Sequence, residues 1–324
     1  MKKQWTRTEK GWQPDGPMQA GIVSVTPYTP RYGRGALMEQ LQVRAGSDSM
    51  LFLPDRGGQI HEACISGVAL GWDSGTGVVN PALGFVDSAA LGGLGWLRAF
   101  GGWGVRCGMR SMGATSTDEL GIPLSLHGTI DLTPADEVGV TIESETGEVS
   151  LRVAARDVLP VLGSDLYLNS TTTLRPAEKQ ITLLDTVTNS ARRPGPYEIL
   201  YHLNFGNRVG AKGARFLAPY DTAAPRDADA ARYPKGWEVY DPDRPEKVET
   251  VYFFDLHAGP DNLTRAMLIS PDGDMGVSVI WDKRRLPCLT LWQLCTGEVV
   301  GVEPGTNWPT PYQNELTKRR IRTL

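Results

Sequence analysis

The feature that most constrains the fold of this chain is a long series of short strand-like segments separated by turn residues. The segments that follow residue 130 are 140–144, 148–156, 166–174, 179–189, 251–256, 265–269, 276–281, 289–294 and 298–302. The first four largely alternate apolar with polar side chains, which is the pattern of a half-buried strand. Convincing amphipathic helices are nearly absent. The sequence therefore predicts an all-β protein, a large sandwich with few short helices.

The remaining segments complete this picture of the domain organisation. Residues 41–53 predict two short strands, and residues 54–72 predict a hairpin. Residues 1–35 are polar and contain four prolines, which favours an N-terminal arm or edge strands. We expect residues 36–324 to form a single β-sandwich domain. Residues 210–250 lack clear periodicity, and we expect a long loop over one face.

Composition excludes several classes of function. The chain has 324 residues and a formal net charge of −4, whereas a nucleic-acid partner usually requires a basic face. No apolar run is long enough to cross a membrane or to form a signal peptide, so we expect a cytoplasmic enzyme without a membrane partner. None of the four cysteines forms a Cys-x-x-Cys pair, which argues against a zinc ribbon.

Residues 196–206 predict the wall of a polar cleft. His202 follows an apolar run, and Asn204 lies two residues later, so both side chains point to the same face of a strand. Phe205 points to the opposite face. The alternative interpretation of His202 is a structural core histidine bonded to a neighbouring carbonyl group. We expect Glu198, in the same segment, and Asp185, in the preceding one, to lie on the solvent side of their strands.

The strongest carboxylate candidate is Glu303, which ends a strand-like run and precedes Pro304 and Gly305. These two residues indicate a turn, so we expect Glu303 at the rim of a sheet. A carboxylate in a partly apolar cleft has a raised pKa and can act as a general base near neutral pH. The alternative is an exposed acid in a turn.

Residues 92–104 combine glycines with aromatic side chains and Arg98. No Lys-Ser or Lys-Thr follows this block and no βαβ pattern surrounds it, so it is not a nucleotide-binding loop. Glycine mixed with aromatic residues fits a backbone that passes close to a ligand. Arg98 is a candidate for binding a sugar hydroxyl, a carboxylate or a phosphate, and its alternative is stacking on a tryptophan. Trp72, Trp96, Trp103 and Trp292 are candidate cleft walls or core residues.

His127 resembles His202 in placement, because it also ends a short apolar run. A metal site would have to combine these two histidines with a distant acid, so a site without a metal is favoured.

Four motifs in a fixed order carry a resemblance to a known family. They are Trp-Leu-Arg-Ala-Phe-Gly-Gly at 96–102, Leu-His-Gly at 126–128, Tyr-His-Leu-Asn-Phe-Gly at 201–206 and Val-Glu-Pro-Gly-Thr at 302–306. Together the motifs resemble the aldose 1-epimerase, or galactose mutarotase-like, superfamily. They are closest to a bacterial branch known as a domain of unknown function. The resemblance spans residues 54–309 and implies a β-supersandwich fold.

The resemblance also implies roles for individual residues. In the mutarotases a late glutamate takes the proton of the anomeric hydroxyl, and a histidine gives a proton to the ring oxygen. By matching motifs, Glu303 is the base and His202 the acid, while His127 and Arg98 bind the substrate. Some members use a further acid to hold a sugar hydroxyl, and residues 220–243 offer several aspartates for that role.

The leading hypothesis is therefore a sugar epimerase that interconverts anomers by general acid–base catalysis, with no metal and no cofactor. We expect Asn204 and Trp292 to contribute to substrate binding. The alternatives are a carbohydrate-binding protein without catalysis, and a metal-dependent sugar isomerase or lyase on the same fold. The expected partner is a small sugar, with no nucleic acid and no membrane, and exposed strand edges allow a homodimer.

Overall fold

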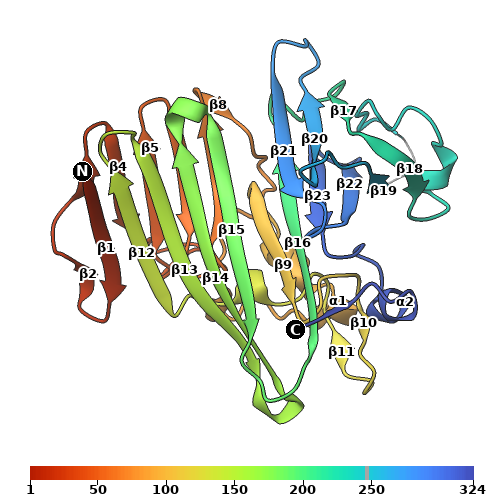
Figure 1. Cartoon of the computed structure of the whole chain (residues 1–324), viewed down its shortest axis with the longest axis horizontal. Helices are drawn as coiled ribbons and strands as arrows, with labels where there is room; N and C mark the ends of the chain where they lie inside the picture. The colour runs from red at the N-terminus through yellow and green to blue at the C-terminus, as the bar shows by residue number, and fades with distance from the viewer. Residues whose placement is uncertain (245–247) are drawn as a thin grey trace.

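The computed structural model describes residues 1–244 and 248–324, and strands dominate it (Figure 1). Two large antiparallel sheets form the sandwich that the sequence predicts. The smaller sheet has six strands in the order β15–β14–β13–β12–β1–β2. Its strands are β1 (Lys2–Thr8), β2 (Gly11–Gln13), β12 (Glu137–Glu143), β13 (Glu148–Leu159), β14 (Ser164–Arg175) and β15 (Gln180–Asn189).

The larger sheet has thirteen strands, with the main order β18–β19–β22–β23–β16–β9–β7–β6–β5–β4–β3. Two further strands, β24 and β8, pair with β16 and β7. Its first half comprises β3 (Met18–Ala20), β4 (Val23–Tyr28), β5 (Gln40–Ala45), β6 (Asp48–Leu53), β7 (Gln59–Ile65), β8 (Val68–Ala69) and β9 (Gly104–Met109). Its second half comprises β16 (Pro196–Phe205), β18 (Tyr220–Pro225), β19 (Glu249–Leu256), β22 (Cys288–Leu294), β23 (Val300–Gly305) and β24 (Arg322–Thr323).

Smaller elements complete the described part of the chain. A three-stranded sheet contains β17 (Arg215–Leu217), β20 (Leu263–Ile269) and β21 (Gly276–Asp282), and β10 (Ser116–Thr117) pairs with β11 (Pro123–Leu124). The α-helices are α1 (Ala90–Gly93) and α2 (Tyr312–Thr317). Neither of these two helices has the length and apolar character needed to span a membrane, and the described residues contain no other helix that does.

The main hydrophobic core lies between the two large sheets. In β12 every second residue is buried, and Val140 and Ile142 join one cluster with Val43 and Met50 of the larger sheet. Full burial of such a side chain contributes roughly 1.5–3 kcal/mol, so the alternation fixes which face of each strand points inward.

A buried ion pair also joins the sheets. The Arg106 guanidinium of β9 donates to both carboxylate oxygens of Asp185 in β15, at 2.6 and 3.2 Å. It also donates to Ser170 and to two backbone carbonyl groups. Burial alone would lower the pKa of Arg106, but the Asp185 carboxylate raises it. The expected solvent-side position of Asp185 is therefore wrong, because this side chain is only 2% exposed.

The loop expected at 210–250 is also corrected by the structure. Residues 215–217 and 220–225 form β17 and β18, and a 3-10 turn spans Ala230–Arg232. β18 pairs with β19, yet its side chains are mostly exposed, so it lacks the alternation by which a strand is recognised. Residues 245–247 of the expected loop lie outside the described residues.

Candidate active site

The pairing of β16 with β23 places His202 beside Glu303. In this antiparallel pair Leu203 lies opposite Val302. The next pair in this unchanged register is His202 opposite Glu303. The His202 Nε2 and Glu303 Oε1 atoms are 3.2 Å apart and face each other without the geometry of a hydrogen bond. The two residues that the sequence singles out as acid and base therefore meet on adjacent strands.

These two side chains lie on the face of the larger sheet that is turned away from the smaller sheet. Tyr201 donates its hydroxyl hydrogen bond to Asp185 of the smaller sheet, so its neighbour His202 points to the opposite face. His202 is 3% exposed and Glu303 is 2% exposed. The prediction that Glu303 lies at a rim is wrong, because β23 continues through Pro304 to Gly305.

Aromatic rings surround the His202 imidazole. The ring centroids of Phe100, Trp292 and His127 lie 4.9, 5.3 and 5.6 Å from it. Trp96 stacks on Phe100 in the same cluster. Side chains of the glycine-aromatic block thus cover this face of the sheet. Trp103 instead packs against Phe205 in the main core, and the opposite orientations of His202 and Phe205 confirm the predicted alternation.

Gly301 keeps a space open between these groups. A Cβ atom at this position would lie 2.7 Å from the Glu303 Oε1 atom, 3.1 Å from the Trp292 ring and 3.2 Å from the His202 ring. Real Cβ atoms do not approach a carboxylate oxygen that closely. Glycine at 301 therefore lets the carboxylate, the imidazole and the indole keep their positions, because a side chain there would displace at least one of them.

Burial drives both groups of the pair toward their neutral forms. Burial, followed by the nearby His127, lowers the pKa of His202 well below its ordinary 6.5. Burial, followed by Glu249, raises the pKa of Glu303 well above its ordinary 4.5. The pair therefore holds one proton over a wide range of pH.

Several buried polar atoms of this face lack a hydrogen-bond partner among the described residues. They are His202 Nδ1, Asn204 Oδ1, Glu303 Oε1 and Thr290 Oγ1. Thr290 lies directly opposite Glu303 on β22. The Asn204 amide nitrogen donates to the Gly102 carbonyl at 2.9 Å, which fixes the side chain on the same face as His202. Unpaired buried polar atoms are costly, so their concentration on one face indicates a site for a polar ligand.

Glu249 is a site residue that the sequence reasoning missed. Its carboxylate accepts a hydrogen bond from Trp292 Nε1 at 2.7 Å and pairs with Arg226 at 2.8 Å. This residue begins β19, and the strand predicted there began two residues later. The acid that the structure brings near Glu303 therefore comes from a strand and not from the aspartates at 220–243. β19 is buried almost continuously from Thr250 to Phe254, so no alternation marks where the strand begins.

His127 lies at the accessible side of the cluster. Its ring packs edge-on against Trp96, with centroids 4.7 Å apart, and the residue is partly exposed. Its Nδ1 atom lies 2.9 Å from the Met112 carbonyl oxygen. Burial of the ring lowers the pKa of His127. The neutral ring therefore stands between the buried pair and solvent.

Arg98 occupies a different position from the other candidates. It belongs to a 3-10 turn, Gly95–Ala99, between the buried Trp96 and Phe100. Its own side chain is exposed, and it makes no hydrogen bond or ion pair with the residues that the structure describes. The structure thus places Arg98 next to the aromatic cover but does not bring it into the polar cluster.

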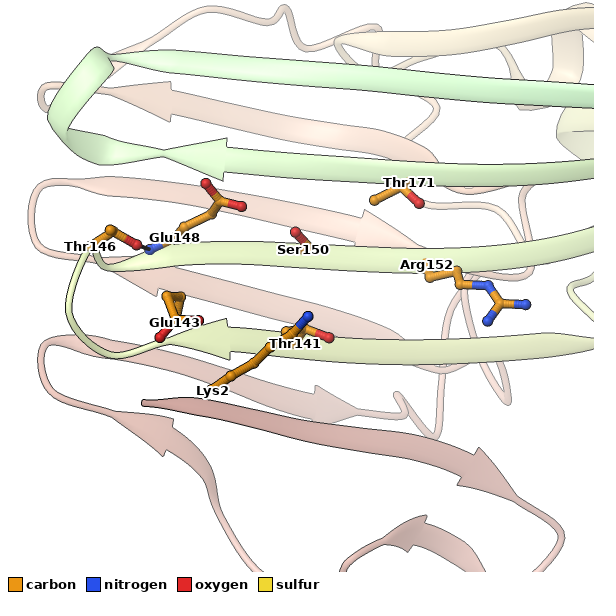
Figure 2. Close-up of a pocket in the computed structure, with 8 residues that line it drawn as sticks. All are labelled: Lys2, Thr141, Glu143, Thr146, Glu148, Ser150, Arg152 and Thr171. Carbon is orange, nitrogen blue, oxygen red and sulfur yellow. Dashed lines mark hydrogen bonds between the residues drawn. The ribbon is translucent and has the colours of Figure 1, made fainter.

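A surface pocket elsewhere has another character. It lies on the outer face of the six-stranded sheet and is lined by side chains such as Lys2, Thr141 and Arg152 (Figure 2). None of the candidate residues lines it. In residues 1–244 and 248–324, no three His, Cys, Asp or Glu side chains gather as metal ligands.

Comparison with known proteins agrees with this architecture. The family model of a domain of unknown function, DUF4432, matches residues 35–324. None of the curated proteins matches the chain. A solved structure from Klebsiella pneumoniae, provisionally named an aldose 1-epimerase, is 30% identical with a TM-score of 0.91. The match covers 100% of this chain and 88% of that one.

Two more distant structures share the fold. A galactose mutarotase-like protein from Clostridium acetobutylicum is 14% identical with a TM-score of 0.58, and the match covers 94% of each chain. Another from Lactobacillus casei is 15% identical with a TM-score of 0.58, and the match covers 88% of this chain and 95% of that one. These similarities confirm the predicted galactose mutarotase-like β-supersandwich.

Proposed function

The chain belongs to the DUF4432 family, which here has the galactose mutarotase-like fold, and from that premise we propose that it is a sugar epimerase. The reaction proposed is the aldose 1-epimerase type, in which the two anomers of a reducing sugar interconvert. The observation that carries this proposal is the buried pair of His202 Nε2 and Glu303 Oε1, 3.2 Å apart and facing the space beside Gly301.

Ring opening requires a base at the anomeric hydroxyl and an acid at the ring oxygen. In the proposed reaction the Glu303 carboxylate takes the proton from O1, while the His202 imidazolium gives a proton to O5. The bond between C1 and O5 breaks, and an open-chain aldehyde forms. After rotation about the bond between C1 and C2, O5 attacks the other face of C1. His202 then recovers its proton from O5, and Glu303 returns one to O1.

The pair contains the one proton that this sequence of transfers needs. Burial favours the neutral resting form, in which the proton sits on Glu303. Hydroxyl groups of a bound sugar would hydrogen-bond to both members and so favour the charged form, with the proton on His202. Positioned proton transfer of this kind accelerates a reaction by about two to four orders of magnitude.

The surrounding residues suit a sugar. The indole ring of Trp292, held by Glu249, offers an apolar face for the C–H groups of a pyranose ring. We propose that His127 and Asn204 bind hydroxyl groups and that Arg98 contacts the sugar where it emerges from the cluster. Because His202 and Glu303 are almost fully buried, the aromatic side chains that cover them, such as Phe100 and Trp96, must move when the sugar enters.

The rate of anomerisation should follow a broad bell against pH, because the pair works only with one proton. The form with two protons appears only below the lowered pKa of His202, so the acid limb should lie below 6.5. The form with none appears only above the raised pKa of Glu303, so the alkaline limb should lie well above 4.5. The measurement is kcat/KM for anomerisation across pH. An acid limb above the ordinary histidine value would contradict this assignment of the proton.

The experiment that tests the function is saturation-transfer NMR with a panel of free reducing sugars. Exchange between the two anomeric proton signals should accelerate for at least one sugar when the protein is added. Each sugar is measured in parallel with and without chelator, so that a contribution from a metal is seen. Sugar binding without faster exchange would instead favour a carbohydrate-binding protein, and acceleration that chelator removes would favour a metal-dependent isomerase.

A further inference from the structure

Glu198 is a buried carboxyl group on the same strand as His202. It lies four residues before His202 in β16. The prediction that Glu198 lies on the solvent side of its strand is wrong, because this residue is only 1% exposed. Its Oε2 atom accepts a hydrogen bond from the Met112 backbone N–H at 2.8 Å. Its Oε1 atom accepts one from the Asn307 side chain at 3.0 Å. Both oxygens are thus occupied by donors from other segments.

The Met112 peptide unit connects Glu198 to His127. The Met112 carbonyl oxygen lies 2.9 Å from His127 Nδ1. A carbonyl oxygen can only accept, so His127 Nδ1 must carry the hydrogen. In the neutral ring the other nitrogen, Nε2, is then an acceptor with a free lone pair. Glu198 thus holds the Met112 peptide, the Met112 carbonyl holds His127 Nδ1, and His127 Nε2 remains available to a ligand.

The backbone of His127 needs this support. Its φ is 58°, in the left-handed region that residues with a side chain rarely adopt. The His127 N–H donates to the Gly113 carbonyl at 3.0 Å. Met112 and Gly113 therefore hold both the backbone and the ring of His127, and Glu198 is the side chain that anchors Met112.

We propose that Glu198 is a positioning residue for substrate binding. By fixing the Met112 peptide, it keeps His127 in the Nδ1–H tautomer, so that Nε2 accepts a hydrogen bond from a hydroxyl group of the sugar. The identity of the ligand rests on the proposed function, but the tautomer does not.

Packing alone does not account for a carboxyl group at this position. Its neighbours on the same face include the apolar Leu200 and Met109, and an apolar side chain would avoid the cost of burying a carboxyl group. Burial raises the pKa of Glu198 to about 7, and the hydrogen bonds from Met112 and Asn307 oppose that rise. The Met112 N–H and the Asn307 amide both need a hydrogen-bond acceptor at this position, and the Glu198 carboxyl group provides it.

The test compares Glu198→Met with Glu198→Gln. Methionine keeps the length but cannot accept the Met112 N–H, whereas glutamine retains one acceptor oxygen. Nitrogen-15 NMR of labelled histidine should show a single Nδ1–H tautomer for His127 in the wild type and in Glu198→Gln. Glu198→Met should show a mixture. Only four histidines are present, so the spectrum of His127→Gln assigns the signals.

Kinetics supply the second measurement. With a sugar that the wild type converts, Glu198→Met should raise KM about tenfold, the loss expected for one hydrogen bond, while kcat changes little. Glu198→Gln should restore KM. Partial unfolding would lower the apparent kcat and leave KM unchanged, so the two effects are distinguishable.

Glu315→Met provides a matched control. Glu315 is also fully buried, but its carboxylate bonds to Thr310 and Arg320 and not to Met112. It should leave the His127 tautomer and KM unchanged. The proposal is overturned if Glu198→Met folds and keeps the single tautomer, or if the tautomer is lost while KM stays the same. If no sugar is converted by the wild type, the proposed function fails, and the tautomer alone decides the role of Glu198.

Discussion

Replacing Glu303 with glutamine is expected to lower the rate of anomerisation by about two to four orders of magnitude. The amide has nearly the size and shape of the carboxyl group, but it cannot take the proton from O1. Glu303 Oε1 has no hydrogen-bond partner among the described residues, so the substitution removes no hydrogen bond from that atom. It also removes a buried ionisable group. The variant should therefore fold as the wild type does and still bind sugar.

The measurement is saturation transfer between the anomeric signals of the preferred sugar, with thermal unfolding as the test of folding. Glu298→Gln is the matched control, since it makes the same change at an exposed position shortly before β23. The control should retain wild-type exchange. If Glu303→Gln also retained it in a folded protein, Glu303 could not be the base, and the proposed mechanism would fail.

Replacing Asp185 with leucine is expected to lower the free energy of unfolding by about 3–5 kcal/mol. The reason is that Arg106, 1% exposed, would keep its positive charge in the interior after losing its only carboxylate partner among the described residues. Tyr201 would lose its acceptor at the same time. Urea unfolding followed by tryptophan fluorescence measures the change.

Two further variants separate the charge from the packing. The double variant Arg106→Met with Asp185→Leu removes both charges, so it should be more stable than Asp185→Leu alone. The exposed pair of Arg152 and Glu137, each 58% exposed, provides the other comparison. Glu137→Leu should change the unfolding midpoint little, because solvent screens that pair. A double variant no more stable than the single one would show that the unpaired charge is not the source of the loss.

The local pattern of the chain was sufficient to predict many of its strands, though not β17 and β18, and the faces of some of them. Alternation placed His202 and Asn204 on one face and Phe205 on the other, because side-chain direction along a strand depends only on neighbouring residues. The prediction that Glu303 lies at the rim of a sheet was wrong because it, too, depended only on neighbouring residues. Pro304 and Gly305 indicate a turn, yet β23 includes both, and a Cβ at Gly305 would lie only 3.3 Å from the Ile199 carbonyl oxygen.

Pairing across long stretches of sequence could not be predicted. Nothing near Asp185 indicates that Arg106 will reach it, and nothing near Glu198 indicates the N–H group of Met112. Both acids sit in strands where their own neighbours suggest solvent. Their burial follows from sheet packing and from the path of the 108–113 segment. The resemblance of motifs supplied the pairing of His202 with Glu303, which the residues alone did not.

The division between the sheet and its cover has a consequence for how such proteins diverge. His202, Glu303 and Gly301 lie on central strands whose backbone bonds hold them in register. The rings of Trp96 and Phe100, in contrast, come from the connection between β8 and β9, and the ring of His127 comes from the connection between β9 and β12. Substitutions or insertions in these two connections can reshape the cover while the paired strands beneath it stay intact. Ligand preference can therefore drift among descendants of one ancestor faster than the reaction itself.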